Sequence, residues 1–110
     1  MKKDGPPAGR PLLTYVEQVD PGMSGLSDLF FSLSDPTRLR MLFALLEGEM
    51  CVSDLARSAG VSESAVSHQL RLLRSRGLVV SRRAGRRVYV SVSPDVVQAL
   101  LSLGLEHVRP

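Results

Sequence analysis

Apolar residues recur at helical spacing through the first half of the chain. Between Ser24 and Leu33 they fall at i, i+3, i+4 and i+7, which predicts an amphipathic helix. Asp35-Pro36 predicts the start of another helix, because aspartate caps helix N-termini and proline is tolerated at the first helical position. We expect this second helix to end at Gly48 and to direct four side chains toward the core: Leu39, Leu42, Phe43 and Leu46.

Two further helical segments follow, separated by a short turn. The first is Val52–Ala59, which is expected to stop at Gly60, and the second runs from a Ser62 cap to about Arg76. The second segment has a buried stripe of Val66, Leu70 and Leu73. Two helices joined by a short turn with glycine predict a helix-turn-helix, with Val61 as the apolar plug between them.

After Gly77 the spacing becomes that of β-strands. Leu78–Val80 and Val88–Val92 are β-branched runs on either side of a polar segment, which predicts a hairpin with its turn at Ala84-Gly85. A hairpin directly after a helix-turn-helix forms a wing. The expected fold class is therefore mainly α with a β-hairpin wing (α+β), a winged helix-turn-helix.

Ser93-Pro94-Asp95 predicts the start of a last helix that is apolar over most of its circumference. Such a helix must be covered, and a second copy of the chain is the simplest cover. A length of 110 residues leaves room for one core. We assign residues 21–110 to one winged helix-turn-helix domain that ends in a dimerisation helix. Residues 1–20, which are rich in Pro, Gly and Lys up to about Pro11, are assigned to a flexible arm or a short helix.

Charge is distributed unevenly along the chain. Between Ser64 and Pro94 there are seven of the 14 basic residues and none of the 11 acidic ones. The seven are Arg71, Arg74, Arg76, Arg82, Arg83, Arg86 and Arg87. A basic segment on an otherwise acidic body indicates a directed contact with a polyanion, for which duplex DNA is the obvious candidate.

Other features narrow the function class. The single cysteine, Cys51, fits a reducing cytosol, and the absence of a long apolar run predicts a cytoplasmic protein with no membrane partner. There is no Ser/His/Asp or Cys/His set and no phosphate-binding glycine loop, so no enzyme is expected.

Short polar and basic side chains lie opposite the buried stripe of the helix that ends near Arg76. Arg71 can donate two hydrogen bonds to a guanine edge, and wing arginines suit phosphates or an adjacent minor groove. A solvated helix face is the plain alternative, but a face without acids favours DNA. The predicted DNA-binding residues are Ser62, Ser64, Ser67, His68, Gln69, Arg71, Arg74, Arg82, Arg83, Arg86 and Arg87.

Three segments carry a resemblance: SDPTRLR at 34–40, EMCVSDLA at 49–56 and GVSESAVSHQLR at 60–71. They closely resemble the ArsR/SmtB family of bacterial winged-helix repressors, many of which sense metals. The resemblance covers about residues 26–108. It implies a dimer joined by the first and last helices, a recognition helix at 64–71, a wing at 82–87, and operator half-sites about one helical turn apart.

The resemblance also implies two metal sites, which this chain keeps only in part. The thiolate site has Cys51 but Ser53 at its second position and no cysteine in the arm, so Cys51 is expected to be a small buried apolar residue. The site on the last helix keeps only His107. A relocated zinc or other divalent site would combine Asp95 of one copy with Glu106 and His107 of the other, and the alternative is a set of exposed side chains at a fraying helix end.

The leading hypothesis is a dimeric, sequence-specific DNA-binding transcriptional regulator, a repressor released from its operator by a metal ion or another small effector. No cofactor is required for this role. One alternative is the same regulator without a metal response, and a more remote one is a protein- or RNA-interaction module. A thiol-redox switch is weaker, because it usually needs a second cysteine.

Overall fold

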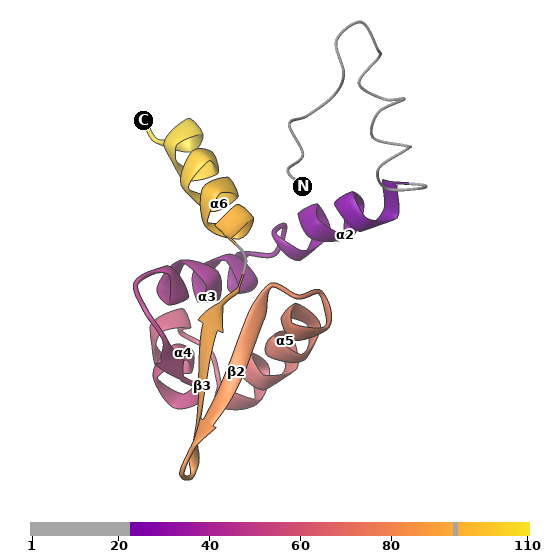
Figure 1. Ribbon diagram of the computed structural model, residues 1–110. Helices are drawn as coiled ribbons and strands as arrows, with labels where there is room; N and C mark the ends of the chain where they lie inside the picture. Colours follow the sequence, from indigo (N-terminus) through magenta and orange to yellow (C-terminus); the bar gives the residue numbers. More distant parts are fainter. Residues whose placement is uncertain (1–22, 94) are drawn as a thin grey trace, which may run out of the picture. The chain divides into compact units, whose positions relative to one another are not determined.

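A computed structural model of the protein describes residues 23–93 and 95–110 (Figure 1). Its elements are α2 (Ser24–Ser32), α3 (Pro36–Leu46), β1 (Met50–Cys51), α4 (Val52–Ala59), α5 (Glu63–Ser75), β2 (Val79–Ala84), β3 (Arg87–Val92) and α6 (Asp95–Val108). This order confirms the winged helix-turn-helix. The arm or short helix predicted for residues 1–20 lies outside the described residues.

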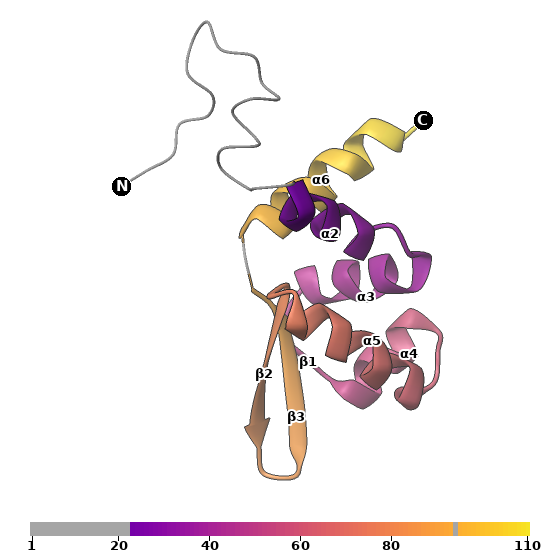
Figure 2. The ribbon, with the colours of Figure 1, turned by 90° about the vertical axis from the view of Figure 1, so that its right-hand side faces the viewer.

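The chain divides into two compact units, Met1–Phe31 and Ser32–Pro110. The described part of the first unit consists of most of α2. The second unit contains the helix-turn-helix of α4 and α5, the three-stranded sheet, α3 and α6 (Figure 2). Over residues 23–93 and 95–110, no helix has both the length and the apolar character needed to span a bilayer.

Local capping places the helices of the second unit as predicted. The Asp35 carboxylate accepts a hydrogen bond from the Arg38 amide at 3.0 Å, with Pro36 at the first helical position. The Ser62 hydroxyl accepts one from the Ala65 amide at 3.1 Å and so fixes the start of α5. Gly60 ends α4 with a φ of +73°, a backbone conformation that side chains with a Cβ rarely adopt.

Gly60 gives a direct stability test of this turn. Gly60→Ala is expected to destabilise the fold by about 1 kcal/mol, because alanine is strained at a left-handed φ although no atom lies within 4 Å of its added Cβ. The unfolding midpoint should fall by roughly 4–8 °C. Gly60→Asn should lose less, since asparagine tolerates this region better. Equal losses for the two variants would show that φ strain is not the cause.

The core-facing side of α3 differs from the predicted one. The buried residues are Arg38, Met41, Leu42 and Leu45, so only Leu42 of the four expected side chains is confirmed. The helix packs on α4 and β3. The run from Met41 to Leu46 is apolar on more than one side, and such a helix offers two stripes between which spacing alone does not choose.

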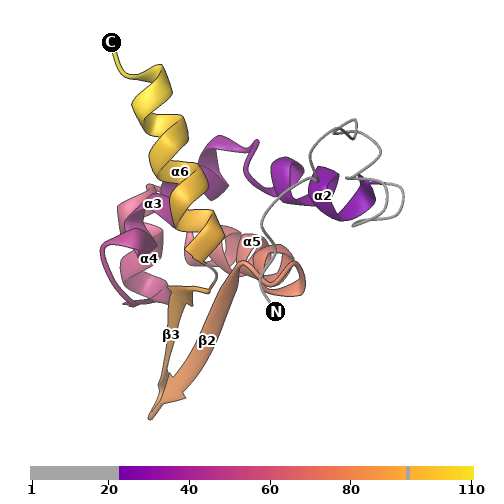
Figure 3. The same cartoon turned by 45° about the horizontal axis from the view of Figure 1, so that its top comes forward.

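The second apolar side of α3 faces α6. An apolar groove of about 380 Å³ is lined by residues of both helices, and α6 crosses α3 in the view of Figure 3. It is lined by Leu39, Phe43, Leu100, Leu101, Gly104, Leu105 and Val108. Leu39 and Phe43 were thus expected in the main core and instead line this groove.

The sheet is antiparallel with strand order β1-β3-β2, and its first strand was not predicted. The two residues of β1 are too few to show an alternating pattern. The hairpin β2–β3 extends away from the helices, with its turn at the far end (Figure 1).

The hairpin turn lies at Gly85-Arg86, one residue later than predicted, and Ala84 pairs with Arg87. The predicted turn would have placed Arg82 opposite Arg87, and like charges directly opposite destabilise a sheet. The observed register pairs Arg82 with Tyr89 instead. Gly85, with a φ of +64°, supplies the backbone conformation that a two-residue turn needs at its first position.

Candidate nucleic-acid interface

One side of α5 is buried and the opposite side is exposed. Val66, Leu70 and Leu73 form the buried side and have at most 1% of their surface exposed. The exposed side holds the predicted DNA-binding residues Ser64, Ser67, His68, Arg71 and Arg74. The Ser62 hydroxyl lies 3.2 Å from that of Ser64, at the start of the same side. The structure brings these side chains together, and their contact with DNA stays a prediction.

A hollow of about 360 Å³ opens beside this exposed side of α5. Its lining is Arg38, His68, Gln69, Arg71, Leu72 and Ser75, without an acidic residue. Hydrogen-bond donors without a neighbouring carboxylate suit phosphate oxygens and base edges. Within the described residues Arg71 makes no hydrogen bond or ion pair, so its guanidinium is available to a ligand.

The guanidinium of Arg38 is buried and joins α3 to α5. Only 7% of the residue is exposed. Its Nε donates to the Ser32 carbonyl at 2.9 Å, and its Nη1 donates to the Gln69 side-chain oxygen at 3.1 Å. Arg76, just after α5, donates to the fully buried Ser32 hydroxyl at 3.1 Å. Because the side-chain oxygen of Gln69 accepts from Arg38, its amide NH₂ group is the part that remains for DNA. The base contact predicted for Gln69 stays a prediction.

The hairpin has an inner face turned toward α5. Side chains alternate along a strand, so residues 79, 81 and 83 of β2 share this face. Val79 is only 3% exposed, and the Ser81 hydroxyl accepts a hydrogen bond from Arg74 of α5 at 3.0 Å. Arg83 on the inner face and Arg86 in the turn make no hydrogen bond or ion pair within the described chain.

Arg82 lies on the opposite, outer face, together with Val80, which is 51% exposed. Its guanidinium sits 4.9 Å from the centre of the Tyr89 ring. Its Nε and Nη2 each lie 2.7 Å from a carboxylate oxygen of Glu49. This bidentate hydrogen bond is the main cause that lowers the pKa of Glu49 and raises the pKa of Arg82, so both groups are charged at neutral pH.

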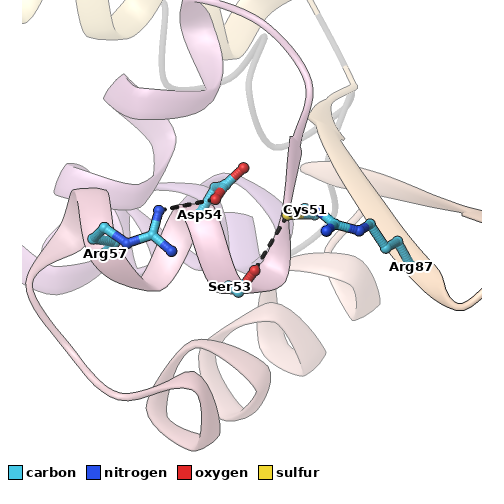
Figure 4. Close-up of polar contacts among 5 residues, drawn as sticks. All are labelled: Cys51, Ser53, Asp54, Arg57 and Arg87. Carbon is cyan, nitrogen blue, oxygen red and sulfur yellow. Dashed lines mark hydrogen bonds and ion pairs between the residues drawn. The ribbon is translucent and has the colours of Figure 1, made fainter.

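Cys51 is 4% exposed and lies at the start of α4 (Figure 4). Its sulfur is 3.4 Å from the Ser53 hydroxyl and accepts a hydrogen bond from Arg87 at 3.7 Å. A hydrogen bond with the Cys51 thiol, and then one from Arg57, lower the pKa of Asp54. The burial agrees with the apolar role expected for Cys51. A single thiol beside a guanidinium does not fit a soft-metal site, because it offers one ligand and a repelling charge.

The candidate ligands Asp95, Glu106 and His107 lie at opposite ends of α6. Asp95 and Glu106 are eleven residues apart on the helix, which corresponds to about 16 Å, so one chain cannot bring both to one ion. Glu106 also lies 4.0 Å from Arg109. Within the part of the chain that is described, no group of three or more His, Cys, Asp or Glu side chains could hold a metal. The two-copy site stays a prediction.

Comparisons with known proteins agree with this geometry. The family described as bacterial regulatory protein, arsR family, matches residues 35–81. A transcriptional repressor SmtB homolog of Synechocystis is 46% identical over 103 residues, covering 88% of this chain and 78% of that protein. The chain belongs to the ArsR family.

A further relative and two solved structures extend the comparison. The regulator NmtR of Mycobacterium tuberculosis is 46% identical over 76 residues, covering 69% of this chain and 63% of that protein. The transcriptional repressor BigR of Xylella fastidiosa has a similar structure, with a TM-score of 0.77 at 26% identity, covering 86% of this chain and 96% of that one. A homodimeric winged helix-turn-helix DNA-binding domain from Mycobacterium bovis has a TM-score of 0.68 at 28% identity, covering 88% and 85%.

This ArsR-family chain is a winged helix-turn-helix DNA-binding transcriptional regulator. Its named relatives are regulators rather than enzymes. Sequence reasoning missed two residues of the site, Arg38 and Glu49. Arg38 and Arg40 are the two arginines of the largely apolar α3, and only Arg38 is buried, which the sequence pattern alone does not show. Glu49 becomes visible only when the sheet brings it to Arg82, 33 residues away along the chain.

Proposed function

We propose that the protein is a dimeric repressor that inserts α5 of each copy into the major groove of an operator and rests its wing on the flanking backbone. The hollow beside the exposed side of α5, whose lining contains no acidic residue, carries this proposal together with the guanidinium of Arg71, which makes no hydrogen bond or ion pair within the described residues. Arg71, His68 and the serines at 62, 64 and 67 would contact bases and nearby phosphates. Arg74, Arg83 and Arg86 would bind phosphates, and the protein would act in the cytoplasm, where bacterial DNA lies.

Footprinting on the DNA upstream of the protein's own gene tests this role. We expect one protected segment, with an affinity that falls steeply as salt rises, because several phosphates are neutralised per dimer. Uniform weak protection along the fragment would contradict sequence-specific binding.

A second apolar stripe on α6 supports the dimer. Val97 and Leu101 are buried, whereas Val96 is 53% and Leu103 is 69% exposed on a different side of the helix. A stripe of this kind needs a cover, and the similar domain from Mycobacterium bovis is homodimeric.

Leu103→Glu should therefore yield a monomer at micromolar concentration and weaken operator binding by roughly 100-fold or more, since the second half-site is lost. Light scattering after size exclusion and DNA titration measure the two effects. Ser102→Glu adds the same charge to the neighbouring, polar side of α6 and should stay dimeric. Equal behaviour of the two variants would remove α6 from the interface.

Metal-triggered release is the second candidate function. It is supported by a relative named as a cadmium resistance transcriptional regulatory protein CadC homolog, which is 38% identical over 85 residues. In this chain it would depend on Asp95 of one copy with Glu106 and His107 of the other. Only a dimer can unite these residues.

We expect the purified protein to bind its operator in the presence of EDTA, because DNA binding as proposed uses no metal. Titration with zinc, nickel and cadmium, followed by elemental analysis, tests the release step. Stoichiometric metal that is lost in His107→Ala would support the site on α6. Retention of that metal in His107→Ala would exclude it.

A further inference from the structure

We propose that Glu49 is a positioning residue of the wing, which holds Arg82 on the outer face and away from the DNA phosphates. The inference rests on the proposed function, in which Arg83 and Arg86 bind those phosphates. It divides the four wing arginines, which are equivalent by composition, into two pairs. Arg83 and Arg86 make no hydrogen bond within the described residues, whereas Arg82 bonds to Glu49 and Arg87 bonds to Cys51.

The carboxylate of Glu49 reaches Arg82 across the whole sheet. Glu49 directly precedes β1 at one edge, Arg82 lies in β2 at the other edge, and β3 runs between them. Tyr89 of β3 lies under the Arg82 guanidinium. Three elements therefore fix this one side chain, which points over the sheet and is anchored by two hydrogen bonds of 2.7 Å.

Binding to DNA would cost Arg82 more than its neighbours. To reach a phosphate, its guanidinium would have to break two charge-assisted hydrogen bonds, which are among the strong ones in proteins, and leave the tyrosine ring. Arg83 and Arg86 have no such bonds to break within the described residues. Phosphates should therefore engage these two, while Arg82 stays with Glu49.

The orientation of the hairpin gives an independent reason. Arg83 shares the inner face with Ser81, which contacts α5 through Arg74. Adjacent residues of a strand point to opposite faces, so Arg82 is directed away from the side on which α5 would meet DNA. Glu49 thus sets how many phosphates the wing neutralises.

The test is the salt dependence of binding to a short mixed-sequence duplex, measured by fluorescence anisotropy with the full chain. Arg83→Ala should reduce the slope of log K against log salt by about 0.9 per chain, the value of one lost phosphate contact. Arg82→Ala, one position away on the other face, should leave the slope unchanged. Glu49→Ala should steepen the slope by about 0.9 and tighten binding roughly 8-fold per chain at 0.1 M salt, because Arg82 is released.

Glu47→Ala is the matched control. It removes the same charge two residues before Glu49, but the Glu47 carboxylate has no bond to Arg82. Its slope should remain that of the wild type. Equal slope losses in Arg82→Ala and Arg83→Ala, with no change in Glu49→Ala, would overturn the inference. Equal gains in Glu47→Ala and Glu49→Ala would also overturn it, because net charge alone would then explain the effect.

Arginine Nε–H signals in NMR spectra separate this inference from the proposed function. On addition of the duplex, the Arg82 signal should stay in place and the Arg83 signal should move. Movement of the Arg82 signal would overturn the role of Glu49. An Arg83 signal that does not move, together with an unchanged slope for Arg83→Ala, would contradict the proposed wing contact. The Arg82 signal would still test whether Glu49 holds Arg82.

Discussion

Arg71→Ala is expected to remove most of the preference for operator DNA over mixed-sequence DNA. Arg71 lies exposed on α5, and within the described residues nothing else occupies its guanidinium. A bidentate contact to guanine discriminates against the wrong base by about 1–3 kcal/mol. Two copies in a dimer give about 2–6 kcal/mol, so the specificity ratio should fall by roughly 30-fold or more.

Competition titrations of the footprinted segment against a mixed-sequence duplex measure this ratio. Arg109→Ala removes the same charge near the end of α6, where Arg109 lies 4.0 Å from Glu106, and should retain the wild-type ratio. Loss of affinity for both duplexes to the same extent in Arg71→Ala would show that Arg71 binds only phosphate. The guanine contact would then be wrong.

Arg38→Ala is expected to produce the largest loss of stability among the arginine substitutions considered. It removes the guanidinium that donates to the Ser32 carbonyl and to the Gln69 side-chain oxygen. A buried group that loses its donor costs about 1–3 kcal/mol, and this applies to the Ser32 carbonyl, whereas the half-buried Gln69 oxygen is accessible to water. We therefore expect a loss of about 1–3 kcal/mol and a fall in the unfolding midpoint of roughly 5–20 °C.

Two further variants make the origin of this loss clear. Arg38→Met keeps most of the buried volume but donates no hydrogen bond, and it should be nearly as unstable as Arg38→Ala. Arg57→Ala removes an arginine whose side chain is 76% exposed and should change stability by less than about 0.5 kcal/mol. Thermal unfolding followed by circular dichroism measures all three. Wild-type stability of Arg38→Met would contradict the account of the hydrogen bonds.

The helix boundaries of the helix-turn-helix could be predicted from the sequence because contacts between residues close in the chain determine them. The Asp35 and Ser62 caps and the turn at Gly60 involve contacts within a few residues, so the helix-turn-helix could be predicted in detail. The exposed side of α5 followed from the same periodicity.

Features that depend on long-range packing could not be predicted. The apolar run of α3 allowed two stripes, and only the positions of α4, β3 and α6 decide between them. The predicted hairpin register is one residue off because Gly85 can stand at either position of a two-residue turn. The cross-strand pairs decide the register, and the observed one avoids placing Arg82 opposite Arg87. The segment from Ser64 to Pro94 contains no acidic residue, but the fold brings the carboxylate of Glu49 from outside this segment to Arg82.

The central claim is that two copies of α5 recognise DNA together about a twofold axis. Selection of binding sites from a random duplex library tests it most directly, because the library presupposes no operator sequence. We predict an enriched inverted repeat whose half-sites are about 10–10.5 bp apart from centre to centre. Enrichment of a single unrepeated site, or of no sequence at all, would contradict the claim.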